Sequence, residues 1–101
     1  MVGKPDAGPP PHPGKWVAAA LSESRISKAK VAELIGISRK HLYDIIDCKK
    51  SISPRNAVRL AKFFGNDPLS WLHLQMTYDL WFAAQDVDVS NIPTFKVRSA
   101  P

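Results

Sequence analysis

The sequence predicts a single all-α domain of five short helices, and three observations support this fold class. Apolar residues recur at intervals of three and four from Lys15 to about Gln85, which is the periodicity of amphipathic helices. Serine or aspartate residues suited to cap a helix precede four of these segments, and proline follows the cap twice. A chain of 101 residues is long enough for one small core to which most helices contribute.

The chain divides into an amino-terminal arm, a domain and a tail. Residues 1–13 contain five prolines and two glycines, which favour a flexible arm that builds no core. We expect the domain to span residues 14–85 and the tail to span residues 86–101. The first helix should run from Lys15 to Glu23. Its inward face is predicted to consist of Trp16, Val17, Ala20 and Leu21.

The second and third predicted helices are close neighbours in the chain. Ser27 should cap the second helix, and Gly36 should end it in the left-handed conformation that glycine adopts freely. Ser38 should cap the third helix, which continues to about Asp47. Their inward positions are Val31, Ala32 and Ile35, then Leu42, Ile45 and Ile46. Helices joined so tightly cross steeply, which is the helix-turn-helix geometry that offers its second helix to the DNA major groove.

Two cap-and-proline pairs predict where the last two helices begin. Ser53-Pro54 starts a fourth helix that ends at Phe64, and Asp67-Pro68 starts a fifth that ends near Gln85. The inner face of the fourth helix should contain Ala57, Leu60, Ala61 and Phe64. The tail has no identifiable strand partner, although its apolar residues alternate weakly at Val87, Val89, Ile92, Phe95 and Val97.

Positive charge is concentrated on the helix-turn-helix segment. The chain carries a net charge of +5, but residues 25–65 alone hold ten basic and three acidic side chains, a net of +7. The remainder of the chain is therefore weakly acidic. A cationic surface that coincides with a helix-turn-helix pattern favours double-stranded DNA as a partner.

The amino-terminal turn of the third helix holds the strongest candidates for base contacts. Arg39 and Lys40 face outward there, and an arginine can donate to both acceptors of a guanine edge. Tyr43 is a candidate for a phosphate or a thymine methyl group. Asp44 either accepts from a cytosine amine or pairs with Lys40 one turn back, and we favour the pairing.

Phosphate contacts are expected around the starts of the second and fourth helices. Free first-turn amides and lysines gather there, which suits an anionic backbone. The complete set of predicted DNA-binding residues is Ser27, Lys28, Ser38, Arg39, Lys40, His41, Tyr43, Asp44, Lys49, Lys50 and Arg55.

No catalytic or metal-binding pattern is apparent. The histidines and the single cysteine, Cys48, lack the spacing of metal ligands, and no nucleophile-base arrangement stands out. We therefore predict that the protein is not an enzyme and needs no cofactor. One cysteine fits a reducing cytoplasm, and no apolar run is long enough to span a membrane.

The fifth helix is apolar around most of its circumference, which favours a two-fold homodimer interface. The predicted interface residues are Trp71, Leu74, Tyr78, Trp81 and Phe82. The alternative is that this surplus is covered internally, with the tail folded over the helix.

From Pro11 to about Asp88 the chain resembles the HigA-type antitoxins of the Xre-like helix-turn-helix class. The matching stretches are His12-Pro13-Gly14, Val31-Ala32, Gly36-Ile37-Ser38, Ser53-Pro54 with Ala57 and Arg59-Leu60-Ala61, residues 67–75 (DPLSWLHLQ) and Tyr78-Asp79-Leu80. The resemblance implies a five-helix fold like that of lambda repressor, and a homodimer on a palindromic operator in its own promoter. It also implies neutralisation of a small RelE-like (HigB-like) toxin that cleaves mRNA, in the bacterial cytoplasm at the nucleoid.

One departure from the family pattern concerns the end of the third helix. The family usually has glycine there, where this chain has Cys48, so either Asp47 or Cys48 must tolerate the left-handed conformation or the helix must end differently. Two other functions stay open on the sequence alone. These are a stand-alone Xre-type repressor without a toxin partner, and an interaction module that no longer binds DNA.

Overall fold

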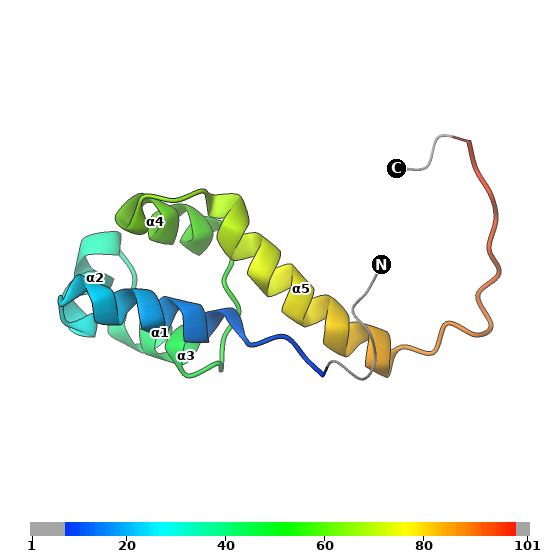
Figure 1. Ribbon diagram of the computed structural model, residues 1–101, viewed down its shortest axis with the longest axis horizontal. Helices are drawn as coiled ribbons and strands as arrows, with labels where there is room; N and C mark the ends of the chain where they lie inside the picture. Colours follow the sequence, from blue (N-terminus) through cyan, green and yellow to red (C-terminus); the bar gives the residue numbers. More distant parts are fainter. Residues whose placement is uncertain (1–7, 99–101) are drawn as a thin grey trace.

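The computed structural model describes residues 8–98, which form five α-helices and no strand, as the sequence predicts (Figure 1). The helices are α1 (Pro13–Ser24), α2 (Lys28–Ile35), α3 (Arg39–Ile46), α4 (Pro54–Phe64) and α5 (Pro68–Asp86). Residues 1–7 of the predicted arm and 99–101 of the predicted tail lie outside the described residues.

The core lies among the first four helices and the amino-terminal half of α5. Its buried side chains come from every helix and from the α3–α4 linker, and they are Val17, Leu21, Val31, Ala32, Ile35, Leu42, Ile45, Ile52, Ala57, Leu60, Ala61 and Trp71. Helix α5 packs mainly against α4, while its carboxyl-terminal half extends past the other helices (Figure 1). Phe64, predicted to lie inside, is only partly buried at the edge of this core.

The predicted caps of α2 to α5 are confirmed. The side chains of Ser27, Ser38, Ser53 and Asp67 each accept a hydrogen bond from a first-turn amide of the helix that follows. Gly36 ends α2 with a φ of 80°, and its amide donates to carbonyl oxygens of the last turn. These short-range bonds fix where each helix begins and ends, and hence where its first-turn side chains lie.

Helix α1 starts earlier than predicted. His12 is its N-cap, accepting from the amide of Gly14 at 2.9 Å, and both His12 and Pro13 are buried. The last two residues of the predicted arm therefore belong to the packed domain. A Cβ atom on Gly14 would collide with the carbonyl oxygen of Ile45, so this glycine permits the close approach of α1 to α3.

Trp16 is a second correction in α1. It was predicted to face inward, but half of its surface is exposed, whereas Val17 and Leu21 are buried as predicted. Spacing alone placed Trp16 beside these residues, yet it lies on the margin of the inward stripe, where no other helix covers it.

Cys48 takes the left-handed conformation at the end of α3, with a φ of 64°. Its amide donates to the carbonyl of Ile45, and the next amide, that of Lys49, donates to the carbonyl of Asp44 at 2.7 Å. Of the alternatives that the sequence left open, Cys48 adopts the positive φ and Asp47 does not. A residue with a Cβ atom is strained in this left-handed conformation.

The predicted dimer residues of α5 mostly face their own chain. Trp71 is a core residue, 5% exposed, whose indole N–H donates to the side chain of Asn66 at 3.0 Å. Leu74 packs partly against the core, and the ring of Tyr78 meets that of His12 edge-on at 4.9 Å. Trp81 is half-buried, so only Phe82 of the predicted set is exposed. The surplus apolar surface of α5 lies instead on the opposite side, at Leu69, Met76 and Leu80.

The carboxyl-terminal tail does not cover α5. Residues 87–98 form no regular structure, and every one of them is exposed. Figure 1 shows this segment running away from the helices. The alternative of an internally folded tail is therefore wrong. None of the described helices combines the length and the hydropathy that crossing a membrane requires.

Candidate nucleic-acid interface

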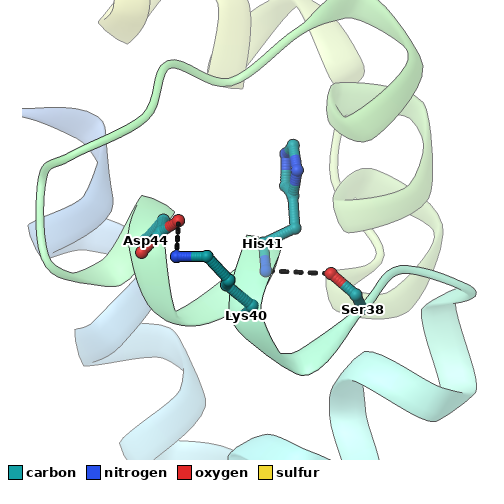
Figure 2. Close-up of polar contacts among 4 residues, drawn as sticks. All are labelled: Ser38, Lys40, His41 and Asp44. Carbon is teal, nitrogen blue, oxygen red and sulfur yellow. Dashed lines mark hydrogen bonds and ion pairs between the residues drawn. The ribbon is translucent and has the colours of Figure 1, made fainter.

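The outer face of α3 presents the side chains that the sequence assigns to base contacts. Leu42 and Ile45 are fully buried and fix the rotation of the helix, whereas Ser38, Arg39 and Lys40 are exposed. Ser38 Oγ accepts from the amide of His41 at 3.0 Å, which stabilises the first turn (Figure 2). This turn therefore projects two cations from a narrow helix, as insertion into a major groove requires.

Asp44 pairs with Lys40 across one helical turn, as we favoured. The distance from Lys40 Nζ to the nearer carboxylate oxygen is 3.2 Å (Figure 2). The ammonium group is largely exposed, so the pair contributes only a few tenths of a kcal/mol. Lys40 can therefore exchange this partner for a base or a phosphate with little loss of stability.

His41 is bound from within the domain. Its Nε2 lies 2.9 Å from the side-chain amide of Asn56, in the first turn of α4, and Asn56 is 8% exposed. In Figure 2 the imidazole points away from Ser38 and from the Lys40–Asp44 pair. A DNA contact by this ring would require the hydrogen bond to Asn56 to break, so the predicted contact of His41 stays a prediction. The contact instead ties the start of α4 to the recognition helix.

The start of α2 lies beside the outer face of α3. Ser27 and Lys28 are exposed, and Lys28 lines one shallow hollow together with Tyr43, Ile46 and Asp47. Tyr43 is 40% exposed. The structure thus brings the predicted phosphate contact at Lys28 next to the predicted contact at Tyr43, although fifteen residues separate them in sequence.

The α3–α4 linker presents its cations on a braced backbone. The amides of Lys49 and Lys50 both donate to the carbonyl oxygen of Asp44, at 2.7 and 3.1 Å. At the far end of the linker, Gln75 of α5 accepts from the amide of Ile52 at 2.7 Å. The side chains of Lys49, Lys50 and Arg55 are exposed.

Three residues that shape this interface were missed by the sequence reasoning. Arg59 of α4 was counted as a cation and as part of a family motif, but its guanidinium donates to the carbonyl of Ile35 at 2.8 Å and so caps α2. Gln75 and Asn56 hold the linker and His41 through contacts between helices. For Asn56 and Gln75, a polar side chain among apolar core positions was the available signal, since buried polar groups normally have a hydrogen-bond partner. Arg59 is exposed and offered no such signal.

A metal site does not form among the described residues, where no three His, Cys, Asp or Glu side chains gather closely enough. Lys40 and Asp44 form one of two ion pairs in this part of the chain, and the other joins Lys30 to Glu33 at 3.5 Å. The exposed surface of α3 and the first turns of α2 and α4 therefore carry unneutralised positive charge.

The comparisons with known proteins agree with this geometry. The helix-turn-helix family HTH_3 matches residues 18–71, which include α2 and α3 in full. The chain therefore belongs to the Xre-like helix-turn-helix family.

Within this family, the resemblance to HigA-type antitoxins is confirmed. A solved addiction module antidote of the HigA family from Coxiella burnetii is 32% identical, with a TM-score of 0.79 over 88% of this chain and all of that one. The Pseudomonas aeruginosa antitoxin HigA, solved with the higBA promoter, is 28% identical, with a TM-score of 0.76 over 85% of this chain and 99% of that one.

The chain is also similar to a curated relative. Virulence-associated protein A' of Dichelobacter nodosus is 40% identical over 72 residues, which cover 70% of this chain. The matched region spans 63% of that relative, less than two thirds of its length.

Proposed function

We propose that the protein is a transcriptional autorepressor that binds a palindromic operator in its own promoter. The observation that carries this proposal is the exposed Arg39–Lys40 pair on the first turn of α3, flanked by cations from α2 and from the α3–α4 linker. The Pseudomonas aeruginosa HigA structure, which contains a promoter, supports DNA as the partner of this fold.

The operator-bound form is proposed to be a homodimer. A two-fold pair would place two copies of α3 about 34 Å apart, one turn of DNA, and so read two half-sites. The exposed apolar stripe on the outer side of α5 supports this arrangement, because one protomer leaves it uncovered.

The protein is further proposed to neutralise a RelE-like toxin that cleaves mRNA, and to act by binding and not by catalysis. The similarity to an addiction module antidote of the HigA family supports this part of the proposal. A repressor without a toxin is the competing outcome, and the family fold alone does not separate the two.

A gel-shift titration against the protein's own upstream DNA tests the repressor function. We expect tight binding that weakens steeply with salt, because lysine and arginine contacts release counterions from the phosphates. Lys28→Ala should lower affinity for all sequences alike and reduce the salt slope by about 1. Complete absence of salt-sensitive binding would exclude both repressor functions and leave an interaction module.

Co-purification from the native operon tests the toxin partner. We expect a small basic protein encoded by the adjacent reading frame to accompany the tagged chain, and its mRNA cleavage to stop when the chain is added. If the adjacent frame encodes no such protein and DNA binding is intact, the protein is a stand-alone repressor.

A further inference from the structure

The tail is rich in exposed apolar side chains that its own protomer leaves uncovered. Five of its twelve described residues are 56% to 86% exposed, and they are Val87, Val89, Ile92, Phe95 and Val97. Segments that stay free in water are normally poor in β-branched and aromatic residues. The composition of this tail therefore indicates that it packs against something.

The direction of the tail is set by a turn just beyond α5. The amide of Ile92 donates to the carbonyl of Val89 at 3.0 Å, and the amide of Ser90 donates to the carboxylate of Asp88 at 2.9 Å. Beyond the turn the chain runs outward (Figure 1). Phe95 and Val97 are two residues apart, so in an extended chain their side chains share one face.

A matching apolar surface exists on α5. Leu69, Met76 and Leu80 are each more than half exposed, and their spacings of seven and four place them on one stripe of the helix. Trp71 and Gln75, on the other side, are buried against the protomer's own core. The stripe therefore faces away from the core of its own protomer.

Charge complementarity links the two surfaces. The only charged side chains within α5 are the carboxylates Asp79 and Asp86, and both are exposed. The far end of the described tail carries Lys96 and Arg98 beside its apolar residues, and both are also exposed. The cations at the far end of the tail therefore complement α5, whose own charged side chains are both carboxylates.

We propose that the tail of each protomer lies across the Leu69–Met76–Leu80 stripe of a second copy of the chain. The six described residues beyond the turn reach about 20 Å when extended, and the stripe covers only about 17 Å along the helix axis. Reciprocal exchange pairs the same two surfaces twice, as a two-fold interface requires. This inference rests on the proposed homodimer and names the surfaces that form it.

Sedimentation equilibrium of the full-length chain tests the proposal with matched substitutions. We expect Phe95→Ala and Leu80→Ala each to raise the dimer dissociation constant about tenfold, because each removes a large apolar side chain from the exchanged contact. Leu34→Ala is the control, since Leu34 is 55% exposed on α2 and Leu80 is 56% exposed on α5. None of these exposed side chains contributes to the folded core, so helix content by circular dichroism should not change.

The outcomes separate this inference from the proposed homodimer. A dimer whose dissociation constant is unchanged by Phe95→Ala overturns the tail exchange and leaves the homodimer standing. A wild-type chain that remains monomeric at every concentration overturns both.

A cysteine cross-link identifies which protomer the tail contacts. All variants carry Cys48→Ser, so that no native cysteine interferes. A mixture of Leu80→Cys chains and Phe95→Cys chains should form a disulfide-linked dimer under mild oxidation. As the control, a mixture of Leu34→Cys chains and Phe95→Cys chains should form none. When both substitutions are in one chain, a disulfide within a monomer at high dilution would show that the tail packs on its own α5 and would refute the exchange.

Discussion

Helices α3 and α5 differ in how apolar side chains are distributed around the helix axis. In the eight residues of α3, buried Leu42 and Ile45 face the core and polar or charged groups face outward. In the nineteen residues of α5, apolar side chains lie on both sides, with Trp71 inside and Leu80 outside. When only one face of a helix is apolar, the sequence indicates which residues can contact a partner, because the apolar residues are buried in the core. A two-sided pattern does not indicate this. Four of the five residues predicted for the dimer interface are buried or partly buried in their own chain, and their place in a dimer stays a prediction.

The inner side of α5 can be tested through Trp71. Replacement by alanine should lower the free energy of unfolding by about 3–5 kcal/mol, because it leaves a large cavity in the core. Urea denaturation followed by circular dichroism measures the change, and Leu34→Ala should stay within about 0.5 kcal/mol of the wild type. A loss below about 1 kcal/mol would show that Trp71 is not a core residue and would favour its predicted place in the dimer interface.

The outer side of α3 can be tested through Arg39. Replacement by alanine should remove about 1–3 kcal/mol of discrimination at one base position per half-site, because a forked contact to guanine is lost. The affinities for operators that differ at a single base measure this discrimination. The free energy of unfolding should not change, because Arg39 is exposed. An equal loss of affinity on random DNA would make Arg39 a phosphate contact.

The strain at the end of α3 can be tested by substitution of Cys48. Replacement by glycine should raise the free energy of unfolding by about 1 kcal/mol, because glycine adopts a φ of 64° without the clash that a Cβ atom causes. Cys48→Ala keeps the Cβ atom and is the matched control. Equal stabilities of the glycine and alanine variants would argue that the turn carries no strain.

The smallest expected effect concerns pH and the contact between α1 and α5. Burial lowers the pKa of His12 in the folded protein, and the nearby carboxylate of Asp79 opposes this only in part. The unfolded chain, with a histidine pKa of about 6.5, therefore binds a proton more readily than the folded chain. The contribution of neutral His12 to the free energy of unfolding should be fully present above about pH 6.5. It should decrease as the pH falls from there towards the lower pKa of the folded state.

His12→Asn provides the control for this pH dependence, because asparagine can still cap α1 but does not titrate. Denaturation midpoints of the two proteins, measured from pH 7.5 to pH 5, should diverge as the pH falls. Parallel curves would show that protonation of His12 is not linked to folding.

The candidate site was predictable where it depends on local chemistry. Ser38 as a cap, Arg39 on the first turn and the Lys40–Asp44 pair all follow from neighbours within four residues. The hydrogen bond of His41 was not predictable in this way, because its partner, Asn56, is fifteen residues away and becomes adjacent only when α4 packs on α3. Arg59 and Gln75 were missed for the same reason, since each binds a backbone group more than twenty residues distant.

The sequence by itself determined the five helices, the caps of α2 to α5 and the family, because periodicity, capping and short motifs are properties of neighbouring residues. Only the tertiary structure decided that His12 and Pro13 join the core, that the His41 side chain is bound by α4, and that Leu69, Met76 and Leu80 form the uncovered side of α5. These outcomes depend on which surfaces meet when the helices pack, and a helix with apolar side chains all round allows more than one packing.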